Sequence, residues 1–222
     1  MTSLPQRISL VFLLLFNIST LFAEPQNLGL LKNELIHYHD DGEYEKEFNT
    51  VVCKAQHYID KRAAQNNQRG NKQKLAIVLD IDETSLSNYR SMSEHNFSIT
   101  RTGFAREILK SRGAVFASML QLFQDAQRHN ITVFFVSGRN TSERQATEKN
   151  LRSAGYNNWG GLFLKPMDYK EPSIIPFKSG TRQAIEAKGY TIVATIGDQF
   201  SDLKGGFAEK GFKLPNPYYY LP

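Results

Sequence analysis

Two acidic residues separated by one position stand at the end of an apolar run. Asp80 and Asp82 directly follow residues 75–79, Leu-Ala-Ile-Val-Leu, which predict a short buried strand. A strand that ends in acidic residues places charge at the carboxyl edge of a sheet, where open α/β sheets bind ligands. Asp80 could then attack an electrophile while Asp82 carries protons. The same spacing occurs in metal-binding loops and at helix N-termini, so a ligand or turn role for Asp80 and a capping role for Asp82 remain open.

Three further segments place polar side chains next to apolar runs or at the start of a helix. A serine hydroxyl beside flexible glycine backbone can donate a hydrogen bond to a phosphate oxygen. A lysine at the start of a helix can reach an anion beside that helix's positive end. The residues are Ser137 after the run 131–136, Lys178 before a helix expected at 179–188, and Asp198 with Asp202 after the run 190–196.

The elements that must position these side chains follow from the hydrophobic pattern. Strands are predicted at 75–79, 131–136, 161–164 and 190–196, and helices within 24–70 and at 140–154 and 179–188. Asn140 and Glu143 are spaced as a capping box, and Gly155 follows the end of that helix. This alternation predicts an α/β fold, a Rossmann-like parallel sheet with helices on both faces. Because parallel strands end at one edge, the polar side chains are expected to converge there.

Residues 85–130 do not fit the alternation. We expect them to form a small, mostly helical cap inserted over the carboxyl edge of the sheet. Their aromatic residues Tyr89, Phe97 and Phe104 suit either packing within the cap or stacking on an aromatic part of a substrate, and both readings remain open. Residues 212–220 are rich in proline and tyrosine, so we expect an extended strap there rather than a regular element.

The convergent carboxylates predict a cation. An all-oxygen donor set suits Mg²⁺, which together with a lysine would offset the repulsion between Asp80 and a phosphate dianion. Phosphoryl transfer makes this electrostatic demand. The residue types therefore favour a phosphoryl-transfer site.

Four motifs in order resemble the haloacid dehalogenase-like (HAD) phosphohydrolases: Asp-x-Asp-x-Thr at 80–84, Ser-Gly-Arg at 137–139, Lys178, and Gly-Asp-x-x-x-Asp at 197–202. Residues 80–88 are similar to the class B and class C (subfamily IIIB) acid phosphatases. Residues 177–182, 196–199 and 212–217 are similar to the branch that contains plant acid phosphatases and vegetative storage proteins. The resemblance covers residues 75–222 strongly and the helical lead-in loosely.

The resemblance implies a role for each matching residue. Asp80 would be the nucleophile and a metal ligand, and Asp82 would be the proton donor and acceptor, with its backbone carbonyl on the metal. Ser137 and Lys178 would bind the phosphoryl group. Asp198 would be a further metal ligand, with Asp202 nearby or as an alternate ligand. Thr84 would support the Asp80 loop. Lys165 is a rival to Lys178 as the phosphate-binding lysine. Arg139 is assigned no catalytic role.

The first 23 residues are expected to form a signal peptide. Arg7 precedes the apolar stretch 8–16, and Ala23 suits cleavage. The apolar stretch is too short for a stable membrane span, so we expect no membrane insertion after cleavage. Residues 24–222 would then form one phosphatase domain. The expected location is outside the inner membrane, either periplasmic or secreted.

Composition narrows the possible partners. The formal net charge of +5 is spread along the chain, without a basic block that would indicate nucleic acid binding. Cys53 is the only cysteine, which excludes an intramolecular disulfide, and its helical apolar surroundings predict a buried thiol. Glycosylation sequons occur at Asn96, Asn130 and Asn140. Asn130 adjoins an expected buried strand and Asn140 an expected loop of the site, where glycans would obstruct folding or binding, and this favours a bacterial source.

The sequence therefore predicts an exported, Mg²⁺-dependent acid phosphatase. Its substrates would be small phosphomonoesters, with nucleoside monophosphates among the candidates, and the reaction would pass through an aspartyl-phosphate. A phosphotransferase, or a non-enzymatic storage or binding protein on the same scaffold, remains the alternative. The oligomeric state, the pH optimum and the physiological substrate are not predicted.

Overall fold

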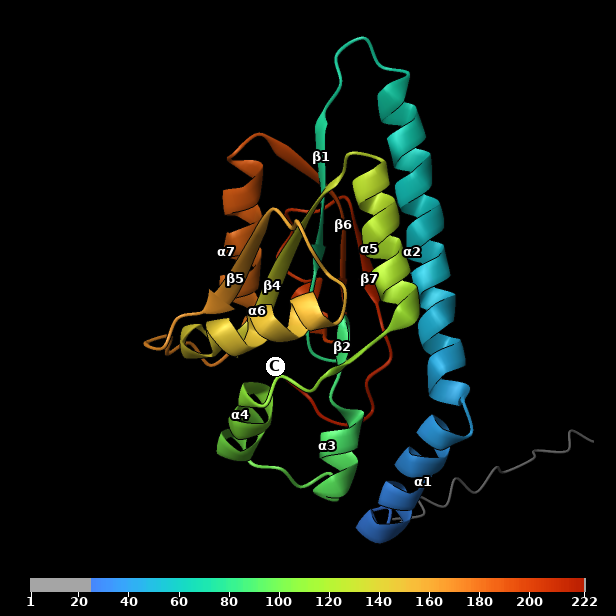
Figure 1. The fold of residues 1–222 in the computed structure, drawn as a ribbon, viewed down its shortest axis with the longest axis vertical. Helices are drawn as coiled ribbons and strands as arrows, with labels where there is room; N and C mark the ends of the chain where they lie inside the picture. Colours follow the sequence, from blue (N-terminus) through green and yellow to red (C-terminus); the bar gives the residue numbers. More distant parts are fainter. Residues whose placement is uncertain (1–24, 222) are drawn as a thin grey trace, which may run out of the picture.

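A five-stranded parallel sheet forms the centre of the structure within residues 25–221, the part of the chain that this computed structural model describes (Figure 1). The strand order is β5-β4-β1-β6-β7, and each neighbouring pair is parallel. The strands are β1 (Lys74–Leu79), β4 (Thr132–Asn140), β5 (Gly161–Lys165), β6 (Tyr190–Gly197) and β7 (Lys210–Lys213). The predicted parallel sheet is confirmed, with β1 at its centre.

Helices cover both faces of the sheet, as predicted (Figure 1). One face packs against α2 (Glu43–Asn67) and α5 (Ala117–Arg128), and α1 (Leu28–Asp40) lies against α2. The other face packs against α7 (Ile175–Glu186). Helix α6 (Arg144–Ser153) follows a single 3₁₀ turn, Thr141–Glu143, which begins with the predicted capping box of Asn140 and Glu143.

The alternation of side chains along β1 decides on which face of the sheet the side chain of Asp80 lies. Leu75, Ile77 and Leu79 belong to the core shared with α2 and α5, whereas Ala76 and Val78 belong to the core beneath α7. Side chains two positions apart lie on the same face of a strand. Asp80 continues the second set, and it lines a small pocket together with Val78 and residues of α7.

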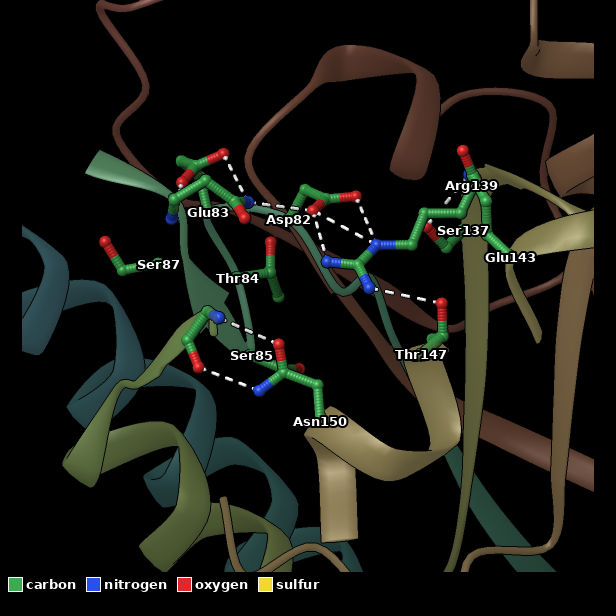
Figure 2. Close-up of polar contacts among 12 residues, drawn as sticks. Asp82, Glu83, Thr84, Ser85, Ser87, Ser137, Arg139, Glu143, Thr147 and Asn150 are labelled. Carbon is green, nitrogen blue, oxygen red and sulfur yellow. Dashed lines mark hydrogen bonds and ion pairs between the residues drawn. The ribbon is translucent and has the colours of Figure 1, made fainter. Parts of the chain in front are cut away.

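Residues 85–130 contain α3 (Tyr89–Glu94), α4 (Arg101–Leu109), α5, and a two-stranded antiparallel ribbon of β2 (Leu86–Ser87) and β3 (Ala114–Val115). Helices α3 and α4 lie beyond the carboxyl end of β1, whereas α5 packs against α2 and β4 (Figure 1). The side chain of Asn150 accepts from the N–H of Gly113 and donates to its carbonyl, each at 2.8 Å, and so ties the returning segment to α6 (Figure 2). The limits of a separate cap stay a prediction.

Two element boundaries differ from the sequence prediction. Helix α7 begins at Ile175 with Pro176 in its first turn, so Lys178 lies inside the helix instead of before it. Proline suits this position because its missing N–H would have no helical partner there. Strand β4 continues to Asn140 through an irregular register, so Ser137 belongs to the strand and not to the following loop.

Two further expectations were wrong. Phe212 and Lys213 were assigned to an extended strap, but they lie in β7, which adds to the edge of the sheet beside β6. Cys53 is exposed on α2, because the buried positions of that helix follow a stripe that passes beside it.

The signal peptide expected at residues 1–23 lies outside the described residues. Within residues 25–221, no helix has the length and apolar character needed to cross a bilayer.

Candidate active site

Lys178 and Asp80 form a buried ion pair at the carboxyl end of β1. The lysine Nζ donates to Oδ1 of Asp80 at 2.9 Å, and it also donates to Oδ1 of Asp202. Lys178 is 3% exposed, Asp80 is 5% exposed and Asp202 is 3% exposed. Lys178, the fourth residue of α7, therefore faces the end of β1, and its ammonium group connects two carboxylates from distant segments.

A third carboxylate completes a buried cluster. Asp80, Asp198 and Asp202 each offer an oxygen, and these oxygens lie within 4.8 Å of one another. The cluster forms because β1 and β6 are neighbours, with Leu79 opposite Ile196, so both chains leave the sheet side by side. Gly197 is required here, since a Cβ at this position would lie 2.3 Å from the side chain of Asp202.

Charge is unbalanced within the cluster. Burial raises the pKa of Asp80 well above its usual range, an effect that Lys178 opposes and the neighbouring carboxylates reinforce. Burial likewise raises the pKa of Asp198 to about 6, with a further contribution from Asp202. Burial alone would lower the pKa of Lys178, but the adjacent Asp202 and Asp80 outweigh it, and the net shift is upward.

This donor set fits a divalent cation. The cluster contains three carboxylates, and its one lysine pairs with two of them, Asp80 and Asp202, so a negative excess remains that a bound cation would neutralise. Oxygen donors are those that hard cations such as Mg²⁺ and Ca²⁺ select. The side chain of Asp82 does not belong to the cluster, which leaves only its backbone carbonyl for the metal role expected from the family resemblance.

Asp82 is held by Arg139 instead. The arginine Nε lies 3.0 Å from Oδ2 and the Nη2 lies 2.7 Å from Oδ1, while Nη1 donates to Thr147 of α6 at 3.2 Å (Figure 2). A further hydrogen bond of 2.8 Å comes from the Asn88 amide to Oδ1 of Asp82. Arg139 is 4% exposed. Sequence reasoning gave it no role, although its place in Ser-Gly-Arg was the available signal.

The loop after Asp80 is fixed by its own side chains. Ser85 Oγ donates to the carbonyl of Asp80 at 2.7 Å, so Ser85 provides the support of the Asp80 loop that was expected from Thr84. Thr84 instead donates to Oδ1 of Asp198 at 3.3 Å, so it supports the cluster from the other side. Ser137 is buried within β4, three residues before the strand ends, and its Oγ accepts the N–H of Arg139 at 3.2 Å. Its hydroxyl proton stays available for an anionic ligand.

Glu83 is a buried carboxylate that sequence reasoning overlooked. Its backbone φ is +51°, a left-handed conformation that is uncommon outside glycine. Its oxygens accept the N–H of Asn88 at 2.6 Å and the hydroxyl of Tyr219 at 2.9 Å. Burial, together with nearby Asp82 and Asp198, raises the pKa of Glu83 to about 8.

The C-terminal strap, defined here as residues 214–221, reaches the cluster from outside the sheet. Asn216 donates to Oδ2 of Asp198 at 2.6 Å, and Tyr219 contacts Glu83 as described. A surface pocket of about 440 Å³ lies where the strap meets Asp198, and Phe200 and Lys213 also line it. These contacts were not foreseen, since nothing local in a proline- and tyrosine-rich tail indicates which loop it covers.

The aromatic residues of the expected cap pack against other rings of the chain. Tyr89 stacks on His39 with ring centres 3.3 Å apart, and Phe97 stacks on Tyr218 at 5.8 Å. Phe104 lies against Tyr219 at 6.4 Å. These contacts favour the packing role over substrate stacking.

Of the two candidate lysines, Lys178 contacts Asp80, whereas Lys165 forms no hydrogen bond or ion pair with a carboxylate in the described part of the chain.

Comparison with known proteins identifies the family. A model of the HAD superfamily, subfamily IIIB (acid phosphatase), matches residues 17–222, and the chain belongs to this family. The stem 28 kDa glycoprotein of Glycine max is 34% identical over 151 residues, which are 65% of this chain and 59% of that protein. Acid phosphatase 1 of Solanum lycopersicum is 34% identical over 148 residues, which are 65% of this chain and 58% of that protein. The chain thus spans less than two thirds of the length of these relatives.

The fold is shared with a solved structure. The class C acid phosphatase from Bacillus anthracis superposes with a TM-score of 0.69 over 86% of each chain, at 22% sequence identity. The family resemblance read from the four motifs is therefore confirmed, as is the HAD-like fold. A plant acid phosphatase stands among the relatives, in agreement with the predicted branch.

Proposed function

We propose that this protein is a metal-dependent acid phosphatase that hydrolyses small phosphomonoesters. The observation that carries the proposal is the buried contact of Lys178 with Asp80 inside a cluster of carboxylates, beside the separately held Asp82. A nucleophile, a cation and a second carboxylate at one sheet edge are the groups that phosphoryl transfer through an aspartyl-phosphate requires. Membership of the subfamily IIIB acid phosphatases supports the same reaction.

In the first half-reaction, a carboxylate oxygen of Asp80 attacks phosphorus and the bond to the ester oxygen breaks. Lys178 holds Oδ1 of Asp80 at 2.9 Å, which leaves the second oxygen free to form the new bond. Asp82 gives a proton to the departing alcohol. Ser137, together with the ammonium of Lys178, receives the charged phosphoryl oxygens.

In the second half-reaction, water attacks the aspartyl-phosphate. Asp82 removes a proton from that water, the bond between phosphorus and Asp80 breaks, and inorganic phosphate leaves. Each oxygen of a carboxylate has two acceptor positions, so Asp82 can exchange a proton while it stays paired with Arg139. A divalent cation held by Asp80, Asp198, the carbonyl of Asp82 and, as an alternate, Asp202 would neutralise charge on the phosphoryl group. Mg²⁺ is the proposed ion.

The proposed substrates are small phosphomonoesters, with nucleoside monophosphates among them. Export to the periplasm or the exterior, after removal of residues 1–23, belongs to the same proposal. The test is phosphate release from a panel of phosphomonoesters with Mg²⁺ and with a chelator, by the parent and by Asp80→Asn. Asp168→Asn, a change of the same type at an exposed position, is the matched control.

We expect release that depends on the metal, survives Asp168→Asn and disappears in a folded Asp80→Asn protein. Release that persists in Asp80→Asn would overturn the nucleophile assignment. A folded parent that releases no phosphate from any ester would contradict the phosphatase proposal and favour the storage or binding alternative. Preferential formation of a new ester when a second alcohol is supplied would indicate a phosphotransferase.

A further inference from the structure

Three donors from three segments hold the carboxylate of Asp198. Oδ2 accepts from Gln199 Nε2 at 2.8 Å and from Asn216 Nδ2 at 2.6 Å. Oδ1 accepts a longer hydrogen bond of 3.3 Å from Thr84. Because Oδ2 already has two partners, Oδ1 is the oxygen with the most capacity left to bind a cation in the cluster.

Asn216 is itself held in a defined orientation. Its Oδ1 accepts the backbone N–H groups of Tyr218 at 2.8 Å and Tyr219 at 3.4 Å, a local turn of the kind that asparagine favours. Since these are donors, they fix the amide oxygen on their side and leave the NH₂ group facing Asp198. The orientation of the Asn216 amide is therefore determined by its contacts on both ends.

The strap that carries Asn216 is anchored on the loop it serves. The N–H of Leu214 donates to the carbonyl of Gly197 at 2.9 Å, directly before Asp198. Gln199 donates to the carbonyl of Tyr219 at 3.3 Å and accepts from the N–H of Leu221 at 3.2 Å. The strap and the Asp198 loop thus form one hydrogen-bonded unit on the outer side of the carboxylate cluster.

We propose that Asn216 is a positioning residue that orients Asp198 for divalent cation binding. It engages Oδ2 with a short hydrogen bond, so that the carboxylate cannot rotate and Oδ1 stays directed at the cluster. Partners of this kind, which hold a metal ligand without touching the metal, typically contribute 10- to 100-fold to metal affinity. The inference rests on the metal site of the proposed function but not on the reaction.

Asn216→Ser tests the proposal by isothermal titration of the chelator-treated protein with MgCl₂, without substrate. A serine oxygen can still accept the N–H of Tyr218, but the shorter side chain cannot donate across to Asp198. We expect the Kd for Mg²⁺ to rise about tenfold or more, while the melting temperature of the metal-free protein changes little. Tyr220→Phe is the control, because Tyr220 is an exposed residue of the same strap, and its Kd is expected to match the parent.

An unchanged Kd in folded Asn216→Ser overturns the inference. A weaker Kd accompanied by a large fall in the melting temperature of the metal-free protein also overturns it, since Asn216 would then act through folding of the strap. If Asn216→Ser does not fold, Asn216→Gln replaces it, because this variant keeps the amide but displaces it by one methylene. The same expected rise in Kd and the same contradicting result apply.

This titration separates the inference from the proposed function. A parent that binds Mg²⁺ but hydrolyses no ester would contradict the phosphatase proposal and leave the role of Asn216 to be decided by the Kd of its variants. A parent that hydrolyses esters, with variants that bind Mg²⁺ as the parent does, would contradict the inference alone. A parent that binds no Mg²⁺ would overturn the inference directly.

Discussion

Arg139 contacts both carboxylate oxygens of Asp82, with Nε 3.0 Å from Oδ2 and Nη2 2.7 Å from Oδ1. The arginine side chain is 1% exposed and that of Asp82 is 13% exposed, so water competes little for the pair. A two-point contact of this kind fixes both the position and the plane of a carboxylate. The proposed acid and base is therefore held by a rigid partner that in turn is anchored on Thr147.

Arg139→Lys should reduce kcat. A lysine keeps the charge but offers a single point of contact, so the Asp82 carboxylate can rotate away from the substrate oxygen. We expect kcat to fall about 10- to 100-fold with a smaller change in KM, as is typical for misplacement of a reacting group. Steady-state kinetics check this, with exposed Arg144→Lys as the matched control. An unchanged kcat would show that the two-point contact has no part in turnover.

Lys178→Met should abolish most activity, whereas Lys165→Met should not. Removal of the ammonium leaves Asp80 and Asp202 beside each other without their shared partner. We expect kcat/KM to fall at least about 100-fold, in the range seen when one preorganised electrostatic group is lost. Lys165→Met serves as the control of identical chemistry on β5. A larger loss in Lys165→Met than in Lys178→Met would reverse the choice between the two lysines.

Mg²⁺ should stabilise the folded protein. A ligand at 100 times its Kd adds about 2.7 kcal/mol to the free energy of unfolding, which for a domain of this size raises the melting temperature by about 5–10 °C. Asp198→Asn should lose most of this shift, because it removes one carboxylate from the cluster. Thermal denaturation with MgCl₂, against NaCl of equal ionic strength, is the measurement. An equal shift in parent and variant would place the ion elsewhere.

The ion pair between Arg62 and Glu209 should make stability depend on pH. Arg62 Nε and Nη2 donate to the two carboxylate oxygens at 2.6 and 2.7 Å and connect α2 to the segment before β7. This pairing lowers the pKa of Glu209 against the opposing effect of burial. Because the folded-state pKa is the lower one, the stabilisation is present above the ordinary glutamate pKa of about 4.3 and is lost as pH falls through the folded-state value.

Glu209→Gln should therefore reduce the free energy of unfolding by about 1 kcal/mol at pH 7, a value discounted for partial exposure. The difference between parent and variant should be smaller at pH 3 than at pH 7, because acidification removes the charge of Glu209 that pairs with Arg62. Urea denaturation at both pH values measures it, and Glu45→Gln, an exposed change on α2, is the control. A difference that is the same at both pH values would show that the charge of Glu209 is not responsible.

The central part of the site could be predicted because it depends on strand ends. The apolar runs predict β1 and β6, and the rule that parallel strands end at one edge is enough to bring Asp80 and Asp198 together. The structure places Lys178 in the same cluster, although α7 begins earlier than its sequence pattern suggested. The catalytic and metal-binding roles of these residues stay predictions.

The residues that hold the site could not be predicted. The partner of Arg139 depends on how the end of β4 faces the loop after β1, and the position of Asn216 depends on where the strap crosses the sheet edge. Neither relationship leaves a periodic or local signal in the sequence. Glu83 shows the same limit, since nothing beside it in the sequence indicates burial next to Tyr219.

The central position of β1 has a kinetic consequence. This strand pairs on one side with β6, whose residues lie more than a hundred positions later in the chain. Contacts so distant in sequence close large loops and form slowly, whereas the helical turns of α2 are local and form fast. During refolding, far-ultraviolet circular dichroism should therefore recover before metal binding does. The ability to bind a cation would mark the last step of folding.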